Sequence, residues 1–435
     1  MLNDRVVTAA MAVAARGGEP PETVRCRVES YIDEIVPAFS LGAYYQLGMP
    51  LARAAIHLFY RPVIDDAALR KLAALPEGVT QVFVLNHRSN FDYVVAGWAL
   101  ARRVAISYAV GEWARVFPLD VLFKAFGGFF VRRGFPDPVY HVVLRRYLQL
   151  IARRGVTQGI FLEGGLTRDG ALRPPKVGLL DALVELAAEG QQLVFVPVGI
   201  NYDRVLEDET LLAEKRGQAA PPTFAQKIIG VLRFLFGLPI WMAMNTMRAL
   251  TGRLHHAGTV AVAFGAPLSL DDAAASLGLS LAALQKADDD TRRNASKCLA
   301  TELMTRIANV IPATPVPLVA HAIDAAGGDL SEAALVQRVQ EIRRTLEERG
   351  VPITPGVELD SLRTSRDTLD ENRSRETALL EGELVGIEES ETIVRLGVER
   401  LVRRRILRRN GDRIVLEDSQ RARELIAYYK RSISS

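Results

Sequence analysis

Short apolar runs alternate with helical patterns through the middle of the chain, from residue 76 to residue 270. Each run has the length of a buried strand, whereas the stretches between the runs repeat apolar residues every three or four positions. We expect strands at Gln81–Leu85, Val104–Val110, Gly128–Val131, Gln158–Leu162, Leu193–Ile200 and Thr259–Phe264. Strands that alternate with helices predict an α/β domain, in which helices flank the sheet.

The first 75 residues are expected to form a helical N-terminal segment, because apolar residues recur at three and four residue spacing. Pro37, Pro50 and Pro62 interrupt the pattern. Within this segment, Met49–Arg61 is apolar, with basic residues towards its ends. This composition suits either core packing or a membrane surface.

Residues 271–435 are expected to form a mainly helical C-terminal region. The pattern predicts a helix over 332–349 and a charged surface helix or linker over 360–375. A helix over 398–405 precedes a hairpin that turns on Asn410-Gly411. Together these last elements predict a small winged module at the end of the region.

The segment 223–254 is the best candidate for contact with a membrane. Residues 228–250 reach the ~20 residues that a membrane span requires, but the run carries Arg233 and Arg248 and is broken by Pro239. We therefore expect an insertion of interfacial helices, with a buried helical hairpin as the alternative.

Composition sets wide limits. At ~150 residues per domain, 435 residues suggest two or three units, and 49% hydrophobic with 24% charged residues is ordinary for a folded protein. The net charge is only +3, so any anion site depends on local placement of Lys and Arg.

Cys26 and Cys298 match no metal-ligand spacing, so we expect no metal, and they fit a reduced, cytosolic setting. The apolar run Val6–Ala15 follows Asp4, which disfavours export.

The segment Asn86–Tyr93 places His87 and Asp92 directly after a predicted strand. Five residues along a regular helix would point these side chains about 140° apart, so they can meet only if the backbone turns between them. A neutral imidazole can take a proton from a substrate hydroxyl, and a carboxylate on its other nitrogen would fix the tautomer. No Gly-x-Ser-x-Gly elbow supplies a serine nucleophile. A structural alternative stays open, in which Ser89 or Asn90 caps a helix and Asp92 lies in its first turn.

Cationic residues follow the predicted strands: Arg88, Arg132, Arg133, Arg168 and Lys176. Ligands of open α/β sheets bind beyond the carboxyl ends of strands, and guanidinium groups match phosphate oxygens. Gly164-Gly165 would let the backbone approach a ligand closely. A Walker A loop is excluded because Ala171-Leu172 stands where Lys and Ser or Thr are required. The cluster predicts an anionic substrate.

These segments resemble the glycerophospholipid acyltransferases, most closely the bacterial glycerol-3-phosphate 1-acyltransferases and dihydroxyacetone-phosphate acyltransferases. The likeness rests on ordered blocks: His87-x4-Asp92, Gly127-Gly128-Phe129-Phe130-Val131-Arg132-Arg133, Phe161-Leu162-Glu163-Gly164-Gly165 and Val196-Pro197-Val198. It covers residues 81–268 well and the remainder loosely. The resemblance implies an acyltransferase-type mixed sheet flanked by helices.

Carried over residue by residue, the resemblance makes His87 the general base and Asp92 its orienting partner. Arg88 and Ser89 would assist near the base. Pro197 would lie beside the acyl donor.

The resemblance also implies that Arg133 and Glu163-Gly164 hold a phosphorylated acceptor. This chain departs from the family pattern after the glycine pair, where Leu166-Thr167-Arg168 replaces Arg-Ser-Arg. One expected phosphate ligand is thus absent. Arg168, Lys176 or Arg173 would then have to compensate.

The implied activity moves a fatty acyl group from acyl-CoA or acyl carrier protein to the sn-1 hydroxyl of glycerol 3-phosphate. The product would be lysophosphatidate, in the first step of phospholipid synthesis. Alternative acceptors are dihydroxyacetone phosphate and a lysophosphatidate. No cofactor is implied beyond the thioester co-substrate, and the enzyme is expected to be peripheral or monotopic on the cytoplasmic face of the membrane.

Other classes of function stay open. Arg403-Arg404-Arg405 and Arg408-Arg409 suit the phosphates of nucleic acid or lipid, so a degenerate family member could be a binding protein. We expect no nucleic-acid partner, because the motif positions of the α/β part are nearly complete. A thioesterase would differ only in that water replaces the acceptor.

Overall fold

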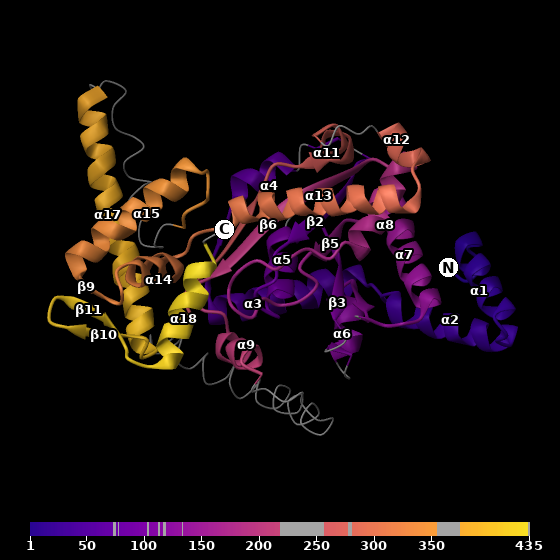
Figure 1. Cartoon of the computed structure of the whole chain (residues 1–435), viewed down its shortest axis with the longest axis horizontal. Helices are drawn as coiled ribbons and strands as arrows, with labels where there is room; N and C mark the ends of the chain where they lie inside the picture. The colour runs from indigo at the N-terminus through magenta and orange to yellow at the C-terminus, as the bar shows by residue number, and fades with distance from the viewer. Residues whose placement is uncertain are drawn as a thin grey trace.

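An eight-stranded mixed sheet forms the centre of the molecule (Figure 1). The computed structural model describes residues 1–72, 75–76, 78–101, 104–111, 114–115, 119–132, 134–217, 256–276, 281–354 and 375–433. The strand order is β1 (Arg61–Ile64), β7 (Thr259–Phe264), β6 (Leu193–Tyr202), β2 (Thr80–Leu85), β5 (Gln158–Phe161), β3 (Ser107–Gly111) and β4 (Gly128–Val131), and β8 (Leu268–Ser269) pairs with β6. β2 runs parallel to β5 and β6, whereas β7 runs antiparallel to β6. The predicted α/β class with a mixed sheet is confirmed.

Each strand expected from the sequence is present, but β1 and the two-residue β8 of the central sheet were missed. β1 lies inside the segment that was predicted to be wholly helical, and that prediction is wrong there. β1 is short and pairs only with β7, at the edge of the sheet. An edge strand tolerates Pro62, which the pattern had marked as a helix break.

Alternating side chains of β2 pack into different cores. Val82 and Val84 join a cluster with leucines of α8 and α13, whereas Phe83 and Leu85 join a cluster that includes Ala96 of α5. The alternating side chains of β2 thus pack against helices on both faces of the sheet.

The helices of the α/β part are α1 (Arg5–Arg16), α2 (Pro21–Ile35), η1 (Ala43–Gly48), α3 (Met49–Phe59), α4 (Asp66–Leu72), α5 (Asp92–Leu100), α6 (Leu119–Ala125), α7 (Pro138–Arg153), α8 (Gly178–Ala188), α9 (Asp208–Lys215), α11 (Leu270–Ser276), α12 (Leu281–Lys286) and α13 (Asp289–Val310).

The α/β part reaches beyond the boundaries expected at residues 75 and 270. β1 precedes the first boundary and pairs with β7. α13 follows the second boundary and packs against β2 and β6. In the described chain, α1 and α2 pack against α7 at the opposite end of the sheet from β1 (Figure 1).

A helical C-terminal part follows α13. It contains α14 (Pro315–Ala325), α15 (Glu332–Glu348), α17 (Arg375–Arg403) and α18 (Gln420–Arg431), with β10 (Leu407–Asn410), β11 (Arg413–Leu416) and β9 (Asp329–Ser331) in an antiparallel sheet. The predicted hairpin is confirmed, and Gly411 adopts a φ of 62° in its turn. The predicted helix over 398–405 is the end of α17.

The last helix docks back onto the α/β part. A Cβ atom added to Gly170 would lie 1.9 Å from the main-chain oxygen of Tyr428, and Gly170 has a φ of 85°. Only glycine fits this contact. The loop that follows β5 is therefore in van der Waals contact with α18.

Two predictions fall on residues that the structure does not describe. The interfacial insertion at 223–254 lies outside the described residues, as does all but the last residue of the charged segment 360–375. Within the described parts, no helix is long and apolar enough to cross a bilayer.

Candidate active site

The turn between β2 and α5 brings His87 and Asp92 together. β2 ends at Leu85 and α5 begins at Asp92. His87 Nδ1 lies 3.0 Å from Asp92 Oδ2, and the side chains are 2% and 0% exposed. Because a carboxylate only accepts hydrogen bonds, we assign the proton to Nδ1, which leaves Nε2 of a neutral ring unprotonated. The imidazole is therefore oriented as a proton acceptor.

Asp92 is itself fixed from several sides. Its Oδ2 accepts hydrogen bonds from the N–H groups of Arg88 at 2.7 Å and Ser89 at 3.0 Å, and its Oδ1 accepts one from the Tyr202 hydroxyl at 2.5 Å. Burial raises the pKa of Tyr202 well above its ordinary value, and the Asp92 carboxylate adds to the rise, so the hydroxyl keeps its proton and donates.

The structural alternative for this motif is correct only in part. Asp92 does lie in the first turn of α5, but the N-cap residue is Phe91 and no side chain caps the helix. Neither Ser89 nor Asn90 is the N-cap. The Asp92 carboxylate binds the turn and the imidazole instead.

Glu163 fastens the loop after β5 to the His87 turn. Its Oε1 accepts the N–H of His87 at 2.7 Å, and its Oε2 accepts the N–H of Arg173 at 2.9 Å. The N–H of Thr167 also donates to the carbonyl of His87 at 3.0 Å. Burial raises the pKa of Glu163, and the two main-chain donors oppose that rise. Both carboxylate oxygens are thus occupied by the backbone, and an acceptor contact for Glu163 stays a prediction.

Arg88 and Ser89 point into the protein. The Arg88 guanidinium donates to the carbonyls of Gly170 at 2.7 Å and Ser432 at 2.8 Å, so it joins the loop after β5 to the end of the chain. Burial lowers the pKa of Arg88. Ser89 Oγ donates to Glu207 at 2.8 Å. In this structure both residues hold the turn that carries His87.

Other predicted site residues are not brought to His87. Arg168 is half exposed and pairs with Glu214 at 3.1 Å. Pro197 is buried within β6, opposite Val84 of β2. Arg133 lies outside the described residues.

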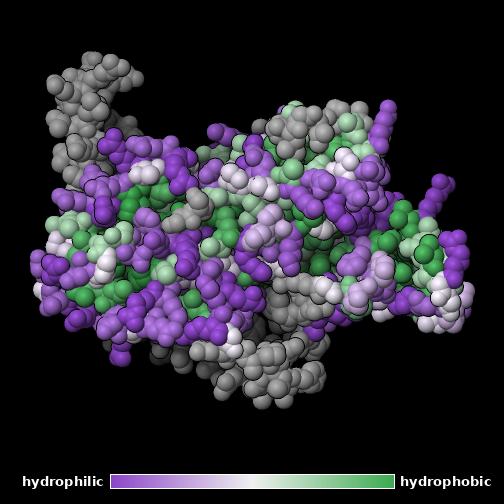
Figure 2. Space-filling model, viewed as in Figure 1, coloured by the Kyte–Doolittle hydropathy of each residue, from purple (hydrophilic) through white to green (hydrophobic). Residues whose placement is uncertain are grey.

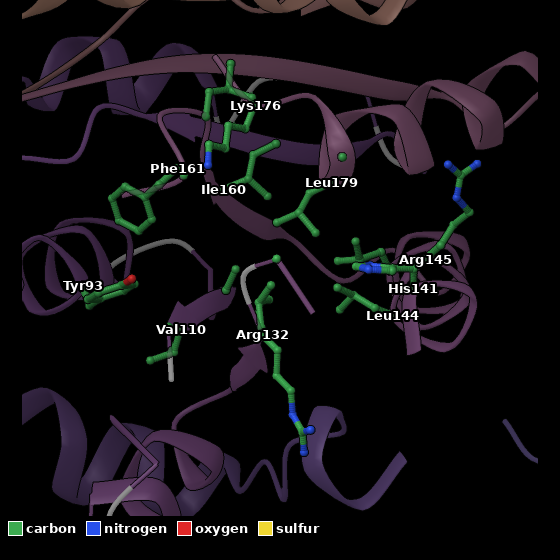
Figure 3. Close-up of a pocket in the computed structure, with 18 of the residues that line it drawn as sticks. Tyr93, Val110, Arg132, His141, Leu144, Arg145, Ile160, Phe161, Lys176 and Leu179 are labelled. Atoms are coloured by element: carbon green, nitrogen blue, oxygen red, sulfur yellow. The ribbon is translucent and has the colours of Figure 1, made fainter. Parts of the chain in front are cut away.

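A cavity of about 390 Å³ lies beside two aromatic residues that pack against His87, which does not itself line the cavity. Tyr93 and Phe161 line it, and their ring centroids lie 5.4 and 4.3 Å from that of His87. Figure 3 shows these two rings on one side of the cavity. The walls between β3, β4, β5, α7 and α8 are mainly apolar: Val110, Val131, Leu144, Leu148, Ile160, Leu162 and Leu179. In the region of α7 and α8, Figure 2 shows a hollow with hydrophobic residues, bordered by hydrophilic ones.

Lys176 lines the cavity, as do Gly164 and Arg132 among the residues expected near the acceptor. Its side chain lies over Gly164, where an added Cβ would come within 2.8 Å of Lys176 Cδ, and Gly164 has a φ of 61°. Lys176 is exposed and forms no ion pair with any described residue. Lys176 therefore offers the cavity an uncommitted positive charge.

Two of the three guanidinium groups on the cavity lining, those of Arg132 and Arg145, are committed elsewhere, whereas Arg293 is exposed and forms no ion pair with a described residue. Arg132 turns away from it, as Figure 3 shows, and pairs with Glu34 while lying 4.6 Å from the ring centroid of Phe135. Arg145 pairs with Asp181 at 2.7 Å and with Glu185 at 2.8 Å. The apolar walls are thus stabilised by ion pairs on their outer side.

Sequence reasoning missed the residues that hold the His87 turn from β6 and from the segment after it. Neither Tyr202 nor Glu207 was among the predicted site residues. Glu207 accepts Ser89 Oγ and the N–H of Asn90, and burial raises its pKa. Their place at the end of a long buried strand and just after it was the available signal, since side chains at that strand end face the same edge as His87.

Two family models match the chain. The model described as Acyltransferase matches residues 67–201, and the model described as Glycerol-3-phosphate acyltransferase C-terminal region matches residues 243–395. The first match includes His87, Asp92, Glu163 and Lys176. Together the matches cover about two thirds of the chain.

Similar proteins include the glycerol-3-phosphate acyltransferase of Aeromonas hydrophila, 29% identical over 278 residues, or 62% of this chain and 32% of that protein. A Mycobacterium tuberculosis protein named plsB1 is 27% identical over 366 residues, or 82% of this chain and 54% of that protein. The chain thus spans about a third to a half of these relatives. A crystal structure of 1-acyl-sn-glycerophosphate acyltransferase from Thermotoga maritima matches 69% of this chain and 94% of that chain, with 15% identity and a TM-score of 0.31.

We expect Glu163→Gln to lower the free energy of unfolding by about 1–3 kcal/mol, because an amide NH2 would replace an oxygen that accepts a buried main-chain N–H. Urea unfolding followed by circular dichroism measures the change. Glu214→Gln is the matched control, since its exposed pair with Arg168 contributes less than about 1 kcal/mol. Equal losses in the two variants would contradict the fastening role of Glu163.

Proposed function

The chain belongs to the glycerol-3-phosphate acyltransferase family, and on that premise we propose that it transfers a fatty acyl group from an acyl thioester to the sn-1 hydroxyl of glycerol 3-phosphate. The product is lysophosphatidate, formed in the first step of phospholipid synthesis. The donor is acyl-CoA or acyl carrier protein, and no further cofactor takes part.

The observation that carries this proposal is the position of the His87–Asp92 pair beside a largely apolar cavity with a lysine on its lining. The apolar walls suit a fatty acyl chain, because a hydrocarbon chain gains free energy by leaving water. Lys176 suits the phosphate of the acceptor, to which it presents a point charge. The two substrate parts thus find matching chemistry next to one imidazole.

The reaction follows from the orientation of the imidazole. His87 Nε2 takes the proton of the sn-1 hydroxyl while the hydroxyl oxygen forms a bond to the thioester carbonyl carbon. The carbon–sulfur bond then breaks, and the imidazolium returns the proton to the departing thiolate. Asp92 holds Nδ1–H throughout and stabilises the transient imidazolium. The ester and a free thiol are the products.

Ion pairing in the C-terminal part favours this function over nucleic-acid binding. Arg404 pairs with Asp208 at 2.7 Å, Arg409 pairs with Glu332 at 2.8 Å, and Arg403 pairs with Glu399. These charges are therefore largely neutralised by nearby carboxylates and are poorly available for phosphates of a nucleic acid. A location on the cytoplasmic face of the membrane belongs to the same proposal, because lysophosphatidate is an amphiphile.

We expect His87→Ala to lower the rate of acyl transfer by about 10² or more, the usual effect of losing a general base. Asp92→Asn should also lower the rate, because an amide can present NH2 to Nδ1 and favour the wrong tautomer. Both rates are measured with one acyl thioester and glycerol 3-phosphate, on variants whose circular dichroism matches the parent. Undiminished turnover by folded His87→Ala would refute the proposal.

We expect Lys176→Met to raise the KM for glycerol 3-phosphate by about tenfold or more, since an interaction with a charged group contributes about 1.5–3 kcal/mol. Arg168→Met is the matched control, because Arg168 faces Glu214 and does not line the cavity. The kinetics should be repeated with dihydroxyacetone phosphate and a lysophosphatidate, with products scored by mass. If the KM changed in the Arg168 variant alone, the phosphate would bind Arg168, and the assignment to Lys176 would be wrong.

A further inference from the structure

The helix that runs from residue 41 to Phe59 through η1 and α3 is apolar on nearly all sides, yet only one stripe of it is buried. Tyr44, Gly48 and Ile56 form that stripe, at spacings of four and eight residues. A helix that is hydrophobic all round is normally enclosed by protein or by lipid. Its outer half is therefore an apolar surface that the described residues leave open.

The open half continues onto neighbouring segments. The N–H of Ser40 donates to the carbonyl of Ala125 in α6 at 3.2 Å, so the start of this helix lies against α6. In Figure 1 both α3 and α6 lie on the same side of the sheet. The large exposed apolar residues of these segments define the docking patch: Phe39, Leu41, Tyr45, Leu47, Leu51, Val121 and Leu122.

The charged side chains on the helix of the docking patch have one sign, whereas the α6 part of the patch is flanked by Asp120 and Lys124. No Asp or Glu occurs from Ile35 to Ile64. Arg53 and His57 are exposed one turn apart on α3. Leu47 of η1 and Leu51 of α3 lie one turn apart on the adjoining side of the same outer half. Arg53 forms no ion pair within the described chain. Apolar side chains bordered by cations are the pattern of a helix that lies in the interface of an anionic membrane.

We propose that the docking patch binds the surface of an anionic lipid bilayer, with Leu47 and Leu51 entering the lipid and Arg53 facing the headgroups. A second copy of the chain fits less well, because a two-fold contact between these helices would bring the Arg53 side chains of both copies towards a helix that has no carboxylate to offset them. The bilayer instead supplies both the apolar phase and the negative charge.

The docking patch lies directly behind the candidate active site. α3 packs against α5, whose first residue is Asp92, and ring centroids of Phe59 and Phe91 lie 5.6 Å apart. Tyr60, next to α3, lies 5.3 Å from Tyr202 by ring centroids. Resting on the proposed function, this placement would hold the imidazole close to the lipid that receives an acylated product.

The test is binding of the full chain to sedimentable vesicles, without substrates. The probe is phosphatidylcholine vesicles with phosphatidylglycerol, compared with phosphatidylcholine alone. We expect Leu47→Asp combined with Leu51→Asp to weaken partitioning about tenfold or more, because burial of one leucine alone contributes that factor. Arg53→Gln should weaken binding to the anionic vesicles about fivefold and leave the neutral ones unchanged. Val13→Asp is the matched control, since Val13 is 60% exposed on α1, away from the docking patch (Figure 1).

Binding by the leucine variant equal to that of the parent would overturn the proposal, as would an equal loss in the Val13 variant. Self-association that the leucine change abolishes, with no vesicle binding by the parent, would assign the docking patch to a second copy instead. His87→Ala separates this proposal from the catalytic one, because it should bind vesicles like the parent. Circular dichroism of each variant confirms that it is folded.

Discussion

The hydrogen bond between Asp92 and His87 is the interaction on which the proposed chemistry depends. A buried carboxylate is costly unless its oxygens are satisfied, and here main-chain N–H groups and the Tyr202 hydroxyl satisfy them. The same contacts fix the direction in which Asp92 can accept from the imidazole. The turn therefore stabilises the buried Asp92 carboxylate and, through it, favours the His87 tautomer with its proton on Nδ1.

Distant parts of the chain converge on this turn. Glu163 binds it from the loop after β5, Glu207 binds it from the segment after β6, and Arg88 connects it to the main chain near the end of α18. Each link uses a buried or half-buried polar group whose loss would leave a partner unsatisfied. Contacts from distant parts of the fold thus hold the proposed general base in place, and the apolar cavity lies beside Tyr93 and Phe161, which pack against it.

The sheet could be predicted from the sequence because its strands are buried on both faces and read as apolar runs. β1 escaped because it is short, lies at the edge and joins an apolar helix. His87 and Asp92 could be predicted from a local spacing, since the turn between them forms within one segment. Sequence reasoning could not predict the roles of Tyr202, Glu207 and the buried Arg88 side chain. These roles depend on partners that are brought together only by the fold. Charge alone also could not separate Lys176, which lines the cavity, from Arg168, which lies outside it.

The most direct test of the central claim is nitrogen-15 NMR of the imidazoles, with His87 assigned by its loss in His87→Ala. The structure predicts that the neutral form of the His87 ring carries its proton on Nδ1 and leaves Nε2 bare, and that Asp92→Asn changes this pattern. A His87 ring with its proton on Nε2, unaffected by Asp92→Asn, would contradict the account.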